Sequence, residues 1–192
     1  MVFGHAGIDT ADPDWFGAAI LMEIMSGGFG SRLMTEVREK RGLAYGVSAG
    51  LAPLDHSALV IGDTATRNDR VADSLAIIRA EWRRMAKHGP SPAEIADAKA
   101  AIIGGYALGL TDSPAIARRL TGLQSLGLPI SYFDDRPARI NAVTADDLRR
   151  IAKRLFQEDK LTIAVVGEPV GVTATDSLPA LNLSLIHISE PT

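Results

Sequence analysis

Residues 27–45 read GGFGSRLMTEVREKRGLAY, and the interpretation of the whole chain starts from this stretch. A glycine-rich turn comes first, then a short charged helix, a further glycine and the start of a strand. Cations, carboxylates and a tyrosine lie close together beside the glycines. Since no other part of the chain combines polar side chains and glycines so densely, we expect the working edge of the domain here.

The helix in this stretch is expected over about residues 31–40, with Ser31 as its N-cap and Gly42 at its end. Arg38 falls at the border of its apolar stripe, and Tyr45 opens the next strand seven positions later. The turn at Gly42 can bring these two side chains together. Arginine offers a planar, permanently charged donor fork and tyrosine a hydroxyl donor, so the pair suits a carbonyl oxygen or an oxyanion.

A second interpretation of the same residues stays open. Arg38 can instead pair on the surface with Glu39 or Glu36, and Tyr45 can serve only for packing. The residues by themselves favour this structural interpretation over a binding site.

Apolar periodicity and turn residues predict the remaining elements. Strands are expected over residues 2–8, 43–51, 58–64 and 161–166, and helices over 15–25, 67–87, from 92, from 113 and from 145. The segment 130–143 is expected to be irregular or weakly helical, and the strand at 161–166 to be buried. Gly104-Gly105, inside a helix, suggests close backbone packing or a kink. This order predicts an α+β fold, a mostly antiparallel sheet with helices packed on one face.

The chain has 192 residues, of which 46% are apolar and 22% charged, as in a globular protein of one domain. A net charge of -3 with 5% aromatic residues argues against nucleic acid as a partner, because phosphate contacts need clustered cations. No apolar run is long enough to span a bilayer, so no membrane partner is expected. The first residues lack the features of a signal peptide and look like the middle of a longer protein.

The residue types exclude several kinds of site. There is no cysteine, and His5, His56, His88 and His187 lie far apart, without the one-turn spacing of a helical zinc site. We therefore expect no metal ligands in this chain. The glycines at 27–30 follow a helix rather than a strand and precede no Gly-Lys-Ser/Thr, so they fit neither phosphate-binding fingerprint well.

Residues 27–33 together with 37–45 resemble the C-terminal half of the M16 zinc metallopeptidases, the pitrilysin, insulinase and processing-peptidase group. Further stretches resemble the same domain, namely 91–94 with Lys99, 127–129, 143–147 and 163–167. The resemblance covers roughly residues 2–168. It implies an M16/LuxS-like domain that carries no zinc and faces a zinc-bearing half across a chamber.

The resemblance also implies roles for particular residues. Arg38 and Tyr45 match an Arg/Tyr pair that binds the substrate backbone and helps to polarise the scissile carbonyl, and Gly27 and Gly28 are expected beside the bound substrate. The His-x-x-Glu-His zinc motif is missing, so the chain is expected to hold no cofactor, to cleave nothing alone and to support chemistry at zinc in a partner half. The expected partners are that N-terminal half or a partner subunit, and an extended peptide substrate. The alternative is a non-catalytic structural or assembly subunit, and the expected compartment is the bacterial periplasm or cytoplasm.

The domain is expected to span residues 1–170, followed by an irregular tail over 171–192. Residues 183–192 continue no periodicity and have no cap; they resemble a translated sequencing adapter, and we expect them to be non-native. The alternative is a native C-terminal strand.

Overall fold

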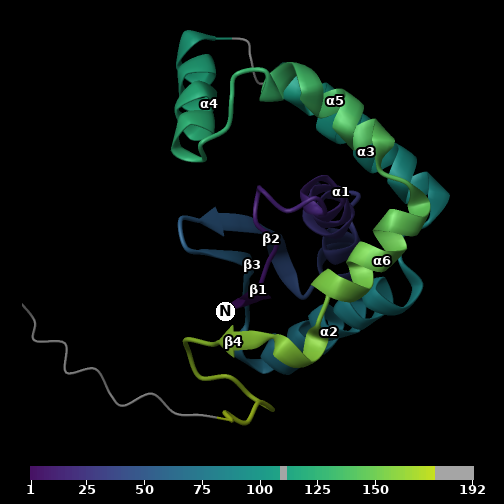
Figure 1. Ribbon diagram of the computed structural model, residues 1–192. Helices are drawn as coiled ribbons and strands as arrows, with labels where there is room; N and C mark the ends of the chain where they lie inside the picture. The colour runs from purple at the N-terminus through teal and green to yellow at the C-terminus, as the bar shows by residue number, and fades with distance from the viewer. Residues whose placement is uncertain (109–111, 176–192) are drawn as a thin grey trace, which may run out of the picture.

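The computed structural model describes residues 1–108 and 112–175, so the expectation for residues 183–192 lies outside the described residues (Figure 1). The strands are β1 (Val2–Ala6), β2 (Ala44–Leu54), β3 (Ser57–Thr66) and β4 (Thr162–Ala164). The α-helices are α1 (Trp15–Ser26), α2 (Val71–His88), α3 (Pro92–Leu108), α4 (Ser113–Ser125), α5 (Tyr132–Ala142) and α6 (Ala145–Leu155). A π-helix, η1 (Met34–Glu39), and two 3₁₀ turns, η2 (Asn68–Arg70) and η3 (Glu158–Lys160), complete them. No helix in the described ranges is long and apolar enough to cross a membrane.

The strands form one antiparallel sheet in the order β2-β3-β1-β4. Its register places Val2 of β1 opposite Asp63 of β3 and Ala164 of β4. Helices α1, α2 and α6 lie on one side of this sheet, and α4 stands apart from it, beyond the end of the α3 and α5 pair (Figure 1). The predicted α+β class is confirmed.

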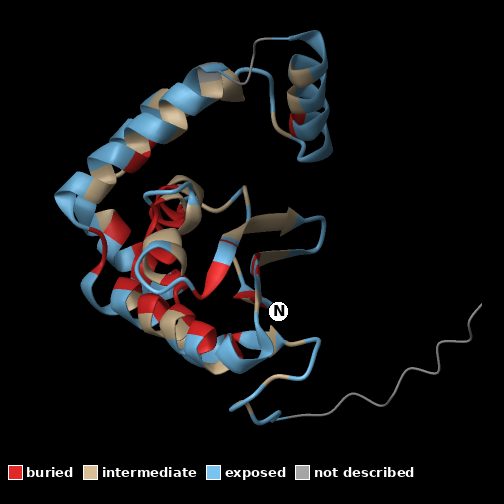
Figure 2. Ribbon diagram, turned by 180° about the vertical axis from the view of Figure 1, so that it is seen from behind, coloured by how far each residue is buried: buried red, intermediate tan, exposed pale blue. Residues whose placement is uncertain are grey.

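The alternation of buried and exposed residues along β1 shows on which face of the sheet the core lies. Phe3 and His5 are buried toward the helices, whereas Val2 and Ala6 are exposed on the other face. The Trp82 ring meets Phe3 edge-on at 5.6 Å between centroids and Phe156 at 5.4 Å. Buried residues accordingly gather where α1, α2, α6 and the sheet face one another, while α4 is largely exposed (Figure 2).

Two predicted helix starts are built as the sequence indicates. Ser91 and Glu94 exchange bonds, with the Ser91 N–H donating to Glu94 Oε2 at 2.7 Å and the Glu94 N–H to Ser91 Oγ at 3.3 Å. Thr144 and Asp147 form a second capping box at α6.

Three local expectations differ from the structure in whole or in part. Residues 132–142 form helix α5, because Tyr132 stacks on Phe16 and Ile140 is fully buried against the core. The last strand is only three residues long and is not buried, since it pairs with β1 alone at the sheet edge. Gly104 and Gly105 lie within α3 with open space beside them, so the close-packing alternative is wrong and the kink stays a prediction.

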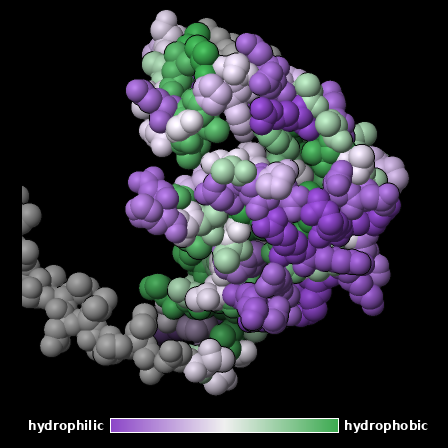
Figure 3. Space-filling view, viewed as in Figure 1, coloured by the Kyte–Doolittle hydropathy of each residue, from purple (hydrophilic) through white to green (hydrophobic). Residues whose placement is uncertain are grey.

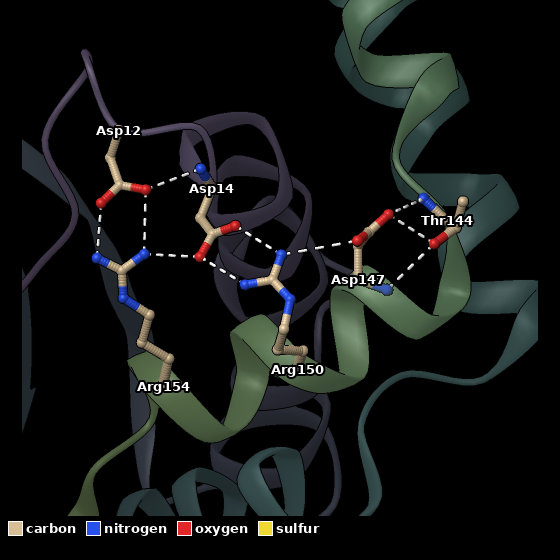
Figure 4. A network of polar contacts seen from close by, with 6 residues as sticks. All are labelled: Asp12, Asp14, Thr144, Asp147, Arg150 and Arg154. Atoms are coloured by element: carbon tan, nitrogen blue, oxygen red, sulfur yellow. Dashed lines mark hydrogen bonds and ion pairs between the residues drawn. The ribbon is translucent and has the colours of Figure 1, made fainter.

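An ion-pair network ties the start of α1 to α6 (Figure 4). The Asp14 carboxylate accepts hydrogen bonds from Arg150 at 2.7 and 2.8 Å and from Arg154 at 2.6 Å, and only 8% of its side chain is exposed. Arg154 also donates to Asp12, whose carboxylate caps the Asp14 N–H at 2.8 Å. These bonds lower the pKa of both aspartates. The network therefore fixes the loop between β1 and α1.

Replacing Asp14→Asn is expected to lower the free energy of unfolding by about 2 kcal/mol, because the hydrogen bonds to two charged guanidinium groups lose their anionic acceptor. Chemical denaturation at pH 7 measures this change. The matched control is Asp146→Asn, whose side chain is 88% exposed and which should change stability by less than about 0.5 kcal/mol. Equal effects of the two substitutions would contradict the assignment.

A second buried polar contact makes stability depend on pH. His5 Nδ1 donates to the Ala6 carbonyl at 2.7 Å, and His5 Nε2 accepts the Trp82 indole N–H at 2.9 Å. Burial lowers the pKa of His5 because the charged ring would lose its hydration. A proton on Nε2 would also face the indole N–H, donor against donor.

The stability that the neutral His5 provides is therefore present above its unfolded-state pKa of about 6.5 and is lost as the pH falls through the lower folded-state value. Unfolding free energies measured between pH 7.5 and 5 should decline, and His5→Gln should flatten that decline. His88→Gln, which removes an imidazole from an exposed helix end, is the matched control with which the decline in His5→Gln is compared. An unaltered slope in His5→Gln would refute this account.

Candidate functional site

The loop after α1 lies beside the free edge of the sheet. Gly27 ends α1, where its N–H donates to the Glu23 carbonyl at 2.7 Å. Ser26 Oγ accepts the N–H of Ala49, in edge strand β2, at 2.8 Å. No other described part of the chain lies against Gly28 within 4 Å of its side-chain position. Ser26 therefore anchors the start of this loop to the edge strand, and the substrate-binding role of the following Gly27 and Gly28 stays a prediction.

The helix that follows is wider than the sequence suggests. It begins at Arg32 and continues as the π-helix η1, with the Lys40 N–H bonded to the Thr35 carbonyl five residues earlier at 3.0 Å. Ser31 precedes the helix as expected, but its buried Oγ has no hydrogen-bond partner in the described parts of the chain. The predicted side-chain cap is therefore wrong.

Gly42 turns the chain from η1 into β2. Its φ of +57° lies in the left-handed region that glycine adopts without strain. The Gly42 N–H bonds to the Arg38 carbonyl and the Leu43 N–H to the Val37 carbonyl, each at 2.9 Å. This turn sets Tyr45, the second residue of β2, against the side chain of Arg38.

The structure brings Arg38 and Tyr45 together and adds a third residue. The Arg38 guanidinium carbon lies 4.7 Å from the centroid of the Tyr45 ring and 5.1 Å from that of Phe29. Such cation–π contacts hold a guanidinium by its face, while its N–H groups point outward in the plane of the group. Arg38 makes no hydrogen bond within the described residues, so these donors stay available.

Competition from neighbouring carboxylates is weak. Glu36 is taken by Lys40 at 2.6 Å and by Arg41 at 2.5 Å, and these bonds lower the pKa of Glu36. Glu39 reaches Arg38 Nε at 3.4 Å, a contact at the surface. Tyr45 is 87% exposed, so it does not pack into the core. Part of the structural interpretation, the Arg38–Glu39 pair, is therefore present, but the packing role of Tyr45 is not.

Phe29 is absent from the site predicted from the sequence, because that prediction was based only on the polar groups of this stretch. It is 73% exposed at the tip of a glycine-rich turn, where a large apolar side chain has no packing reason to be. An aromatic residue on each side of Arg38 in the sequence was the signal that could have identified it.

The residues present do not fit a zinc site. Among residues 1–108 and 112–175, no three His, Asp or Glu side chains lie close enough together to hold a metal ion. Both ring nitrogens of His5 are already used by Ala6 and Trp82.

Comparison with known proteins identifies the domain. A family model described as the peptidase M16 inactive domain matches residues 2–102, more than half of the chain. The chain belongs to the M16 peptidase inactive-domain family.

An uncharacterised zinc protease from Streptomyces coelicolor is 32% identical over 167 residues, covering 87% of this chain and 36% of the relative. A Helicobacter pylori protein named a non-peptidase homolog is 27% identical over 152 residues, covering 77% and 34%. The M16 chain thus spans about a third of the length of these curated relatives.

Solved structures agree with this family. The M16 inactive domain from Pseudomonas fluorescens superimposes with a TM-score of 0.74 at 30% identity, covering 83% of this chain and 38% of that one. An inactive peptidase domain from Bordetella parapertussis gives 0.70 at 17% identity, covering 84% and 87%, which shows the fold alone.

Substituting Gly42→Ala is expected to cost about 1 kcal/mol of unfolding free energy, because alanine is strained at a positive φ even where nothing blocks its methyl group. Gly30→Ala is the control, since it also has open space but no positive φ, and it should change stability by less than about 0.5 kcal/mol. Thermal or chemical unfolding compares the two. A Gly42→Ala protein as stable as Gly30→Ala would show that the turn is not strained.

Proposed function

We propose that this domain is the substrate-binding, zinc-free half of a zinc metalloendopeptidase acting on peptides or unfolded polypeptides. Arg38 and Tyr45 bind the substrate backbone opposite a zinc site in the other half of the protein or in a partner subunit. The proposal depends on one observation about the Arg38 side chain. Its guanidinium group lies against the rings of Tyr45 and Phe29, and its in-plane N–H donors make no hydrogen bond within the described residues.

The chemistry of this arrangement suits a peptide carbonyl. Two exposed aromatic rings orient the cation, so less rotamer freedom is lost when a carbonyl oxygen binds. Donors placed where negative charge develops contribute more as the carbonyl becomes an oxyanion than they do in the ground state. Since this chain offers no fitting set of zinc ligands in its described parts, its share of the reaction is binding and orientation.

The edge strand adds a second means of binding. β2 ends the sheet, and an antiparallel pair leaves every second backbone N–H and C=O of an edge strand without a strand partner. On this edge Ser26 already accepts the N–H of Ala49, so a peptide would add beside that position or displace Ser26. An extended peptide can add to such an edge by main-chain hydrogen bonds. The contact between Ser26 and Ala49 places the Gly27–Gly28 loop beside this edge, so peptide and loop would meet.

The second candidate function is a non-catalytic structural or assembly subunit. It is favoured by the similarity to the Helicobacter pylori protein named a non-peptidase homolog. The domain would then meet its partner through the same face, and Arg38 and Tyr45 would make no difference to turnover.

The test uses the complete protein or the reconstituted complex with its zinc-bearing half. Arg38→Ala is expected to lower kcat/KM for a peptide about 100-fold, since it removes an interaction that strengthens in the transition state. Tyr45→Phe should have a smaller effect, because the ring that orients Arg38 is kept. Zinc content measured on the same samples is the control and should be unchanged. Full activity in both variants would favour the structural subunit.

A further inference from the structure

The other side of the glycine loop forms a small recess, which we call the Glu23 pocket. Its volume is about 340 Å³, at the lower end of ligand pockets. Its walls are Glu23 and Ile24 of α1, the glycines 27, 28 and 30 with Ser31, and Glu94, Asp97, Ala98 and Ala101 of α3. Within the described parts of the chain, no lysine, arginine or histidine lines it.

Glu23 is the unexplained group in this recess. It is half-buried on a helix that is otherwise apolar, and it makes neither a hydrogen bond nor an ion pair through its side chain within the described residues. Burial raises the pKa of its carboxyl, because the charged form loses hydration. Its carboxyl carbon lies only 2.1 Å from the position that a Cβ on residue 27 would take, so a glycine at this position leaves room for the carboxylate. An unpaired, half-buried carboxylate in such a place is stabilised by a cationic partner.

Two further polar groups of the pocket also lack partners of their own. Ser31 is 6% exposed, and its Oγ is buried without a hydrogen bond in the described parts of the molecule. Asp97 adds a second carboxylate for which the described residues provide no ion pair.

Glu94 is already neutralised. Arg32 donates to it at 2.6 and 2.9 Å, which lowers the pKa of Glu94 to about 2. The pocket therefore keeps two uncompensated negative charges, those of Glu23 and Asp97.

These acceptors fit an organic cation rather than a metal ion. The described residues contain no group of three carboxylates or histidines able to hold a metal. Ile24, Ala98 and Ala101 instead supply an apolar wall along which an aliphatic stem can lie while its charged end meets the carboxylates. We propose that the Glu23 pocket binds the protonated side chain of a lysine or arginine of the peptide whose backbone meets Arg38.

This inference rests on the proposed function, because the same short loop carries both sites. Phe29, which contacts Arg38, lies between Gly28 and Gly30, which line the Glu23 pocket. A peptide lying along this loop meets a cation on the Arg38 side and two carboxylates on the other. The domain thereby selects peptides with a basic residue near the bound carbonyl.

The test measures binding of two peptides to the 192-residue chain by calorimetry at low salt and pH 7.5. The probes are acetyl-Ala-Ala-Arg-Ala-Ala-amide and its citrulline counterpart, which has nearly the same shape but no charge. The arginine peptide is expected to bind about tenfold more tightly, as hydrogen bonds to a charged group imply. Glu23→Gln and Asp97→Asn should each reduce this preference, and the double variant should abolish it.

Glu168→Gln is the matched control, since it removes the same charge from an exposed position away from the pocket. It should keep the preference, and thermal unfolding should show that the Glu23→Gln protein is folded. In carbon NMR, the pKa of the Glu23 carboxyl should fall when the arginine peptide binds and stay raised with the citrulline peptide.

The outcomes separate the two proposals. If both peptides bind equally while Arg38→Ala weakens both, the basic-residue pocket is refuted and the proposed function stands. If the preference survives Glu23→Gln with Asp97→Asn, or is lost equally in Glu168→Gln, the pocket is refuted as well. If neither peptide binds at millimolar concentration, the basic-residue pocket is refuted, and the kcat/KM of Arg38→Ala in the complete protein decides the proposed function separately.

Discussion

The indole of Trp82 is the contact on which the rest of the domain depends. Its ring is fully buried on α2, meets Phe3 from β1 and Phe156 after α6, and its N–H is satisfied by His5. Sheet and helices are joined at this point by apolar contact and by one buried hydrogen bond. Because β1 is the strand that pairs with both β3 and β4, fixing β1 against α2 fixes the sheet as a whole.

Helix α1 connects this packed core to the candidate site. Ala18, Ile20 and Leu21 are fully buried and project from different sides of the helix, so α1 is packed on several sides. At the opposite end, Asp14 binds two arginines of α6. The glycine loop therefore leaves a rigid helix at a fixed place, between the edge strand β2 and helix α3. The surface over α5 and α6 is mostly hydrophilic, whereas apolar surface gathers over α4 and near β4 (Figure 3).

The loop separates two charges that would otherwise neutralise each other. Arg38 is oriented by aromatic rings on one side, and the carboxylate of Glu23 lies half-buried on the other. The rings hold the cation without using its in-plane donors, and burial keeps the carboxylate from finding a surface partner. The half-buried carboxylate costs stability, and such departures from local rules are expected at functional sites.

Local chemistry explains which parts of the fold were predictable. Capping boxes at Ser91 and Thr144 and the left-handed turn at Gly42 depend on a few adjacent residues, so their patterns predict them directly. Helix α5 and the short β4 depend on distant partners, such as Phe16 for Tyr132 and β1 for β4. No window along the sequence contains those partners.

Periodicity and caps in the sequence by themselves determined the fold class, and the resemblance of residues 27–45 to M16 peptidases determined the family. The seven-residue spacing across the turn at Gly42 already allowed Arg38 and Tyr45 to meet, because it is a local property. Only the tertiary structure decided that Phe29 joins that pair and that Glu23 of α1 faces Asp97 of α3 across a pocket. The physical reason is that stacking on a cation and burial of a carboxylate are set by which surfaces meet when helices pack, and residue spacing carries no record of this.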